Sequence, residues 1–267
     1  QSSLFDLLGG DGAAGVVMGD KDLPTAEAWP QKQLLAFEKE LIGFYISGHP
    51  LLACGWTLEK YNQCDAIRFA ELPERTRTRI GGLVVNAQKR FTKPKKPDDV
   101  PRPMLSFRLD TLDGSIPAVA FPEAYAQFGI HLQPDAAVML CGSVRKDAGG
   151  GANALTVDEV YPIDETPARF TLSLSLHVNV GTWTEARMNE LKDVIRRHPG
   201  NTPLNICLLY PDNAKVHMRA ANHLTVRVSE ALVKECEKIV DGLYVGTVKQ
   251  AGLRAAPEPR WKSRNGG

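Results

Sequence analysis

A cluster of basic side chains lies in the middle of the chain, between two segments with a strand pattern. Such a cluster suits the phosphates of a nucleic acid, because each Lys or Arg that meets a phosphate releases a condensed counterion. The formal net charge of the whole chain is only +1, so a nucleic-acid surface would depend on local clustering. Asp98 and Asp99 partly offset the cluster. Its basic members are Lys89, Arg90, Lys93, Lys95, Lys96 and Arg102.

Residues that could catalyse a reaction or hold a metal are sparse. Magnesium-dependent chemistry uses closely spaced carboxylates, and we interpret the available pairs as solvated turn carboxylates: Asp98 with Asp99, Asp110 with Asp113, and Asp158 with Glu159. The five cysteines and six histidines are scattered, without C-x-x-C or H-x-x-x-H spacing. Neither a disulfide framework nor a zinc site is expected. The sequence therefore predicts no catalytic residue and no metal ligand, and reduced thiols indicate a cytoplasmic protein.

The basic cluster is expected to join the first two strands of a small barrel. Strands are predicted over residues 80–91, 105–110, 116–121, 138–145 and 155–163, with a short helix over 122–131. Five strands with a helix between the third and fourth is the order of an OB fold. Such barrels bind oligonucleotides mainly on the second and third strands and the flanking loops. The basic cluster would therefore border a nucleic-acid-binding face.

The second predicted strand separates core residues from surface residues. Leu105, Phe107 and Leu109 alternate with polar side chains, so they are expected to face the core. Arg108 then faces outward and is predicted to meet the ligand. The same alternation argues against base stacking by Phe107, and Phe91, beside the basic cluster, is the better aromatic candidate.

The other segments make the predicted fold class α+β, with a barrel and a second, smaller domain. Residues 1–30 indicate a flexible linker, 31–78 a helical segment with a helix over 31–47 followed by irregular chain with short helical turns, and 79–166 the barrel. Residues 167–248 predict a small α+β domain, and 249–267 a disordered tail. In the small domain, Thr182 and Glu185 form a possible capping box, and Ser229 begins a helix that Gly242 would close. No stretch reaches the roughly 18 apolar residues needed to cross a membrane.

Three segments together resemble the alpha subunit of bacterial DNA polymerase III, a replicative DNA polymerase. They are FEKELIGFYISGHPL at 37–51, the barrel sequences RIGGLVVNAQKR and LSFRLDTLDGSIPAVAFPEAY, and the pentapeptide QSSLF at 1–5. The resemblance runs from Gln1 to about Val248 and implies a fragment, the C-terminal region of that subunit. The pentapeptide looks like the family's internal motif for the sliding clamp. Leu4 and Phe5 would then fill an apolar pocket, and Gln1 would hydrogen-bond at its edge.

The resemblance also implies partners. The tau subunit of the clamp loader would bind the C-terminal domain, although no residue there indicates the surface. The family's acidic magnesium-binding site has no match, so magnesium is expected only in a catalytic part outside this chain, and no cofactor is expected within it. The expected function is an accessory region that binds single-stranded template DNA and the clamp, performs no chemistry itself and has no membrane partner.

Three other kinds of protein would show parts of this sequence pattern. An OB-type anticodon-binding module of an aminoacyl-tRNA synthetase would share the barrel, and preference for a tRNA would favour it. A protein-interaction scaffold would share the fold and lack salt-dependent DNA binding. A mutagenic paralogue of the polymerase is a narrower alternative, against which the clamp-like motif and the C-terminal domain both argue.

Overall fold

A computed structural model describes residues 29, 31–42, 48, 50–94, 100–146, 151–221 and 224–253. The chain separates into two compact units, residues 1–48 and 49–267, and each is considered by itself. In the first unit, helix α1 spans Gln31–Ile42, so the predicted helix is present, and its predicted last turn over 43–47 lies outside the described residues. Leu41 and Ile42 of this helix are both exposed. The pentapeptide at 1–5 also lies outside the described residues.

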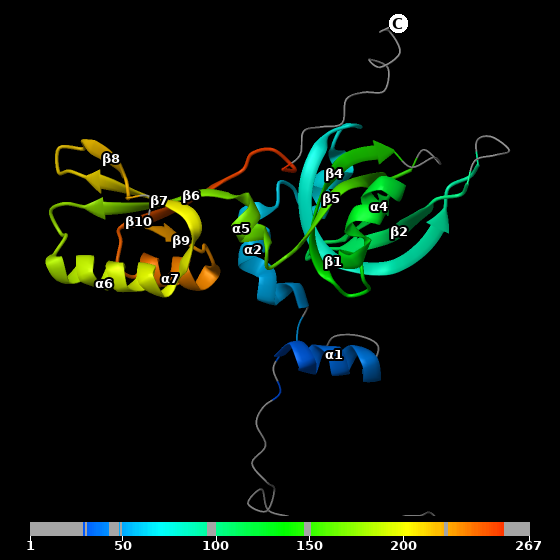
Figure 1. Ribbon diagram of the computed structural model, residues 1–267, viewed down its shortest axis with the longest axis horizontal. Coiled ribbons are helices and arrows are strands. Elements are labelled where there is room, and N and C mark those ends of the chain that lie inside the picture. Colours follow the sequence, from blue (N-terminus) through cyan, green and yellow to red (C-terminus); the bar gives the residue numbers. More distant parts are fainter. Residues whose placement is uncertain are drawn as a thin grey trace, which may run out of the picture. The chain divides into compact units, whose positions relative to one another are not determined.

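Five strands of the second unit form a closed barrel (Figure 1). They are β1 (Arg77–Phe91), β2 (Pro103–Asp110), β3 (Ser115–Ala120), β4 (Ala137–Lys146) and β5 (Asn153–Pro162). The order around the barrel is β1-β2-β3-β5-β4, and the β3–β5 pair is parallel. Helix α4 (Pro122–Phe128) and a 3-10 turn (Gly129–His131) lie between β3 and β4. This is the topology of an OB fold, so the predicted fold class is confirmed.

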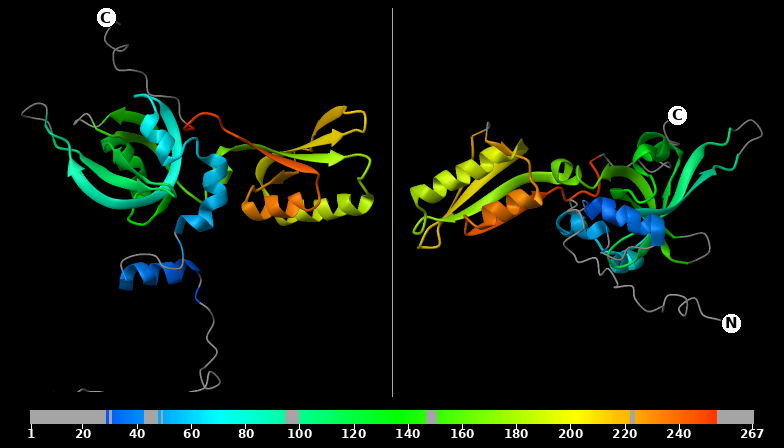
Figure 2. Two further views of the ribbon diagram at one scale, coloured as in Figure 1. Left: turned by 180° about the vertical axis from the view of Figure 1, so that it is seen from behind. Right: turned by 90° about the horizontal axis from the view of Figure 1, so that it is seen from below.

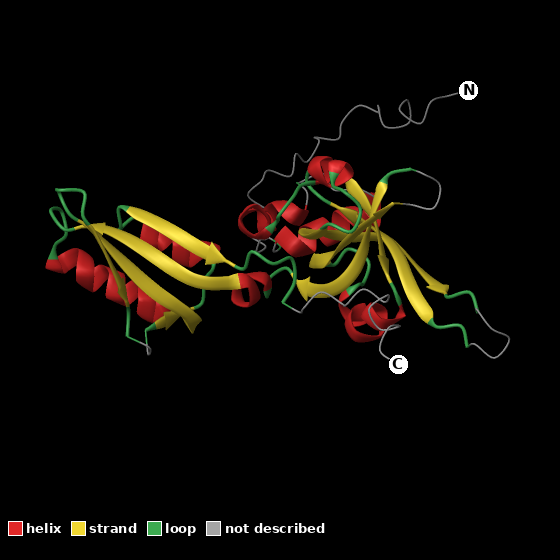
Figure 3. Cartoon of the chain, turned by 90° about the horizontal axis from the view of Figure 1, so that it is seen from above, coloured by secondary structure: helices red, strands yellow, loops and turns green. Residues whose placement is uncertain are grey.

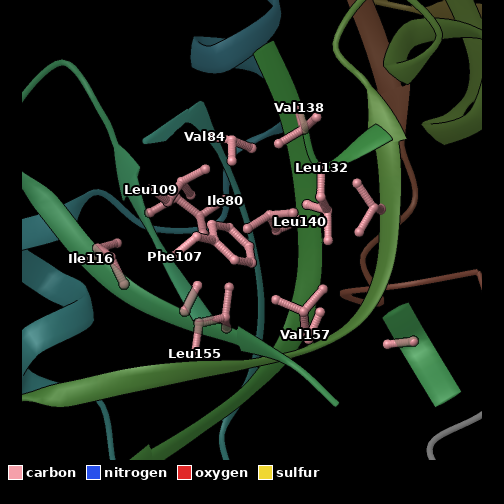
Figure 4. Packing of buried hydrophobic residues seen from close by; sticks show 14 of the residues in the cluster. Ile80, Val84, Phe107, Leu109, Ile116, Leu132, Val138, Leu140, Leu155 and Val157 are labelled. Carbon is pink, nitrogen blue, oxygen red and sulfur yellow. The ribbon is translucent and has the colours of Figure 1, made fainter. Parts of the chain in front are cut away.

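Alternation along the strands fills the barrel with apolar side chains (Figure 4). Leu105, Phe107 and Leu109 are 6%, 3% and 0% exposed, whereas Arg108 between them is exposed. The predicted core face of β2 is therefore confirmed. The predicted turn at 113–114 is also present, and it is closed by a hydrogen bond of 2.8 Å from the Thr111 amide to the Gly114 carbonyl.

Short helices form a second layer outside the barrel. They are a 3-10 turn (Pro50–Cys54), α2 (Gly55–Tyr61), α3 (Ala66–Glu71) and α5 (Thr166–Phe170). The short helical turns predicted within 51–78 are present, and they are too short to show a periodic apolar stripe. Side chains of the 3-10 turn, α2 and α5 pack on the outer faces of β1 and β4, whereas Phe69 of α3 packs in the barrel core. The cluster on the outer faces is Leu51, Leu58, Tyr61, Leu83, Met139, Cys141, Ile163 and Phe170.

A second sheet follows the barrel, in the order β10-β6-β7-β8, with β9 paired to β7. Its strands are β6 (Thr171–Asn179), β7 (Pro199–Leu209), β8 (Lys215–Arg219), β9 (Thr225–Val226) and β10 (Gly242–Thr247). Helices α6 (Glu185–Arg197) and α7 (Glu230–Glu237) lie on one side of it (Figures 1 and 3). In the described part of the chain, no helix is long and apolar enough to span a membrane.

Two capping predictions in this region need correction. The cap of α6 is Thr184, whose hydroxyl accepts the Arg187 amide at 3.3 Å, and not the predicted pair of Thr182 and Glu185. The helix starts at Glu185, so only the residue directly before it can occupy the cap. The predicted cap Ser229 is confirmed by its bond of 3.3 Å from the Leu232 amide. Helix α7 ends at Glu237 and a turn follows, so Gly242 begins β10 instead of closing the helix.

The chain after β10 packs against the barrel over residues 248–253, here called the C-terminal strap (Figure 2). Ala251 is 6% exposed, and the side-chain amide of Gln63 donates to the Lys249 carbonyl at 2.7 Å. A Cβ on Gly252 would lie 2.3 Å from a carboxylate oxygen of Glu159, so glycine permits this close approach. The predicted disordered tail was therefore wrong for residues 249–253, and the remainder of that prediction lies outside the described residues.

Candidate nucleic-acid interface

The outer surface of the barrel is covered on one side and open on another. The cluster of short helices buries the outward side chains of β1 and β4 at Leu83, Met139 and Cys141. On β2 and β3, the outward positions Ser106, Arg108 and Pro117 remain half-buried or exposed, whereas Val119 is 8% exposed. The open side is therefore the one formed by the second and third strands, which is where OB folds bind oligonucleotides.

Arg79 of β1 attaches the C-terminal strap to the covered side of the barrel. This residue is 2% exposed. Its guanidinium donates to the carbonyls of Tyr61 at 2.8 Å, Val248 at 3.2 Å and Gln250 at 3.0 Å, and it lies 4.2 Å from the ring centroid of Phe170. Burial lowers the pKa of Arg79, although a guanidinium keeps its proton in proteins. The side chain is thus used in holding the strap and cannot contact a ligand.

Arg108 lies on the open side, as the sequence predicted. It pairs with Pro117 across the β2–β3 ladder. Its Nε donates to the Ser115 hydroxyl at 2.9 Å and one terminal nitrogen donates to the Ser115 carbonyl at 3.1 Å. These bonds hold the guanidinium flat against β3, and a guanidinium carries five N–H donors. Arg108 therefore keeps donors for a phosphate or a base edge.

The cross-strand register divides the basic cluster between two faces of the β1–β2 hairpin. Arg90 pairs with Met104, on the outward face that also carries Arg108. Lys89 pairs with the core residue Leu105, so it lies on the opposite face, because paired residues share a side of a sheet. A β-bulge between Val85 and Gln88 shifts this register. The predicted cations therefore do not form a single row.

The aromatic candidate Phe91 shares the face of Lys89. It pairs with Pro103, is 59% exposed, and its ring centroid lies 5.9 Å from the Lys89 amino group. A strand that ran onto the outward face of Arg108 would therefore not reach this ring directly. Lys93 and Arg102 are exposed where the hairpin opens, and Lys95 and Lys96 lie outside the described residues.

The sequence reasoning missed two residues of the open surface, Phe121 and Arg145. Phe121 continues the extended backbone of β3 by one residue and is 40% exposed. The guanidinium of Arg145, from β4, lies 5.8 Å from its ring centroid. The Arg145 Nε atom is buried and has no hydrogen-bond partner within the described residues, while the side chain as a whole is half-buried. A ring stacked with a cation suits a base and its phosphate, and continued alternation past Ala120 was the available sequence signal.

The carboxylates considered for magnesium have structural roles. Asp113 accepts the Ala66 amide at 2.8 Å at the start of α3. Asp158 forms an ion pair of 3.1 Å with Arg77, and burial raises its pKa. Glu159 is 1% exposed and accepts the Tyr161 hydroxyl at 2.7 Å. The expectation of solvated turn carboxylates was therefore wrong for Asp158 and Glu159, which lie within β5.

No combination of these groups forms a metal centre in the described part of the chain. Within those residues, no group of three or more His, Cys, Asp or Glu side chains could hold a metal ion. Asp98 and Asp99 lie outside the described residues. Along the open side, the described residues offer cations and an aromatic ring, which are groups that can bind phosphates and bases.

The chain is similar in sequence to several known proteins. The chain is 28% identical over 244 residues to DNA polymerase III subunit alpha of Mycobacterium tuberculosis, covering 88% of this chain and 20% of that protein. It is 30% identical over 242 residues to the Mycobacterium leprae subunit, covering 88% and 19%. The Xylella fastidiosa subunit is 27% identical over 256 residues, covering 89% and 20%.

The chain is related to the DNA polymerase III alpha subunit. This confirms the resemblance seen in the sequence, apart from the clamp motif at 1–5, which stays a prediction. The chain spans about a fifth of the length of these DNA polymerase III alpha relatives. No model of a known protein family matches it.

Solved structures similar to the chain include OB-fold proteins. The second OB-fold domain of replication protein A from Methanococcus maripaludis has a TM-score of 0.29 and 23% identity, covering 35% of this chain and 90% of that one. RecG bound to a three-way DNA junction has a TM-score of 0.27 and 21% identity, covering 34% and 11%.

Proposed function

We propose that this chain is the non-catalytic C-terminal region of a bacterial replicative DNA polymerase. In this proposal it binds single-stranded template DNA on the open side of its barrel and the sliding clamp through Gln1, Leu4 and Phe5. The observation that carries the DNA proposal is the uneven cover of the barrel. Helices and the strap bury the outer face of β1 and β4, while the β2–β3 side remains open and carries Arg108.

The chemistry of the open side supports binding of a single strand in particular. Arg108, Arg145 and Arg90 supply cations for phosphates, and the exposed ring of Phe121 supplies a stacking surface. Stacking on an aromatic ring together with phosphate contacts is the usual way to bind single strands with little base preference. The hairpin cations on the other face, Lys89 and Lys93, would contact DNA that wraps around the hairpin tip.

The remaining parts of the proposal rest on the sequence resemblance to the alpha subunit. DNA synthesis and its magnesium ions would belong to a catalytic part outside this chain, and the chain itself would neither extend a primer nor need a cofactor. The tau subunit of the clamp loader would be a further partner, and the protein would act in the cytoplasm.

Neutralising the outward cations should weaken DNA binding and its dependence on salt. Each phosphate contact on a single strand contributes about −0.7 to the slope of log affinity against log salt. The double change Arg90→Ala and Arg108→Ala should therefore flatten the slope by roughly 1.4 units. The double change should weaken binding to all DNA sequences alike, because phosphate contacts carry no base information. Fluorescence anisotropy with labelled oligonucleotides over a range of salt concentrations measures both effects.

A matched control removes two exposed cations of α6, with Lys192→Ala and Arg196→Ala. This variant has the same net charge as the first and should keep the wild-type slope. An unchanged slope in the Arg90 and Arg108 variant would show that the open side does not bind DNA. Tighter binding of a tRNA than of single-stranded DNA would instead favour an anticodon-binding module.

The clamp proposal has its own test, because its residues are separate from the barrel. Leu4→Ala or Phe5→Ala should each weaken binding to the sliding clamp of the same bacterium by about 2 kcal/mol, the usual cost of losing an apolar anchor. Titration calorimetry of the full chain against the purified clamp measures this loss. Ser3→Ala is the control and should bind normally. Unchanged affinity in both anchor variants would mean that the pentapeptide does not contact the clamp.

A further inference from the structure

The second sheet has one face covered by helices and one face without them. The cross-strand pairs Leu174–Leu204 and Leu176–Ile206 lie on the side of α6 and α7, in the core of this region. Every second position along the strands therefore points to the other side. These positions are Ser173, Ser175, His177 and Asn179 of β6, Asn205, Cys207 and Leu209 of β7, Lys215, His217 and Arg219 of β8, and Gly242, Tyr244 and Gly246 of β10.

At its described strand positions, this helix-free face carries cations and no carboxylate. Lys215, His217 and Arg219 are exposed on β8, and no ion pair engages Lys215 or Arg219 within the described residues. The acidic residues of this region lie elsewhere, for example on α6 and α7, where Asp193 and Glu235 pair with arginines. The charged side chains at these positions are all positive, although the net charge of the whole chain is only +1. Such a positive face suits a polyanion.

One aromatic ring stands free on the same face. Tyr244 of β10 is 64% exposed. Its neighbours on this face along the strand are Gly242 and Gly246, which have no side chain to cover the ring. Across the sheet, Tyr244 pairs with Ser175, which is in register with Asn205 and then Arg219. Three strand spacings of about 4.8 Å place roughly 14 Å between the backbone positions of Tyr244 and Arg219.

We propose that the helix-free face of the second sheet is a second binding surface for single-stranded nucleic acid, separate from the open side of the barrel. Tyr244 stacks on a base, Arg219 and Lys215 contact phosphates, and the Ser175 and Asn205 side chains offer hydrogen bonds between them. This inference goes beyond the proposed function, which uses only the barrel and the clamp peptide.

The composition of the face favours a nucleic acid over a protein partner. The centre of a protein interface is depleted in charge and rich in apolar side chains, whereas the central strands here present mostly serine, asparagine and histidine, together with Cys207, which is 1% exposed, and the half-buried Leu209. The exposed apolar side chains of β8, Val216 and Met218, pair with Leu208 and Ile206 and therefore lie on the helix side. A ring flanked by hydrogen-bonding groups and cations is the arrangement that single-strand binding uses.

The test uses the full chain with Arg90→Ala and Arg108→Ala already in place, so that binding by the barrel is reduced. Anisotropy titrations with a labelled oligothymidylate then compare three changes in this background. Lys215→Ala with Arg219→Ala should flatten the salt slope by a further 1.4 units or so. Tyr244→Ala should weaken binding about five- to a hundredfold through lost stacking, and Tyr244→Phe should keep the affinity of its parent.

The outcomes separate this surface from the barrel. Unchanged slope and affinity in the Lys215 with Arg219 variant and in Tyr244→Ala would overturn the proposal, and the surface would then serve another partner. Equal losses of DNA affinity in Tyr244→Ala and Tyr244→Phe would show that the ring does not stack on a base. If the barrel variants bind normally while the sheet variants lose DNA, the sheet inference stands and the barrel proposal falls. Lys192→Ala with Arg196→Ala, on the helix side, is the control, and thermal melts confirm folding of each variant.

Discussion

Replacing Phe107 with alanine should lower the free energy of unfolding by about 3–5 kcal/mol, the usual cost of emptying a buried aromatic site. The ring is 3% exposed and belongs to the barrel core, together with Ile80, Leu140 and Leu155 (Figure 4). Strands from both sides of the barrel contribute to this core, so the cavity cannot close by moving one loop. Urea denaturation followed by circular dichroism measures the loss.

The neighbouring position provides the control for Phe107. Ser106 points outward from the same strand and is half-buried, so Ser106→Ala should change the free energy of unfolding by less than about 0.5 kcal/mol. A Phe107→Ala variant that unfolds like wild type but loses DNA binding would mean that the two faces of β2 are assigned the wrong way round.

Replacing Arg79 with methionine should lower the free energy of unfolding by roughly 3 kcal/mol, because buried carbonyls lose their donors. Methionine keeps much of the apolar stem but cannot donate to Tyr61, Val248 and Gln250. The C-terminal strap should then detach so that water can reach these carbonyls. Trypsin cleavage after Lys249, followed by mass spectrometry, should become faster than in wild type.

An exposed arginine separates this effect from a general loss of charge. Arg169 is 55% exposed and makes an ion pair of 3.6 Å with Glu165, and such surface pairs contribute about 0–1 kcal/mol. Arg169→Met should therefore unfold nearly as wild type does and keep the strap protected. Equal stability and equal cleavage in Arg79→Met and wild type would show that the carbonyl contacts of Arg79 contribute nothing.

The barrel could be predicted largely because β2 alternates cleanly between buried and outward residues. Leu105, Phe107 and Leu109 lie two residues apart, and the Asp113–Gly114 turn separates β2 from β3. The helices over 50–71 could not be predicted in the same way, since each has only one or two turns. Their positions depend on packing against β1 and β4, which are distant in sequence.

The candidate interface could be predicted only in part. Alternation within one strand placed Arg108 outward, but the faces of Lys89 and Phe91 depend on the bulge in β1, where Asn86 has a φ of 52°. A bulge adds a residue to one strand, and no local pattern in this segment indicates one. Arg79 resembles any surface cation in sequence, and its burial depends on carbonyls from residues 61 and 248–251.

Nuclear magnetic resonance of the arginine Nε–H groups would test the central claim most directly, namely that the open side of the barrel binds single-stranded DNA. The full chain has a mass of 29.2 kDa, and single-arginine substitutions can assign these signals. When oligothymidylate is added, the signals of Arg108 and Arg145 should shift with a common saturation curve. The signal of Arg79, buried on the covered side, should stay in place. Unshifted Arg108 and Arg145 signals at saturating DNA would contradict the account.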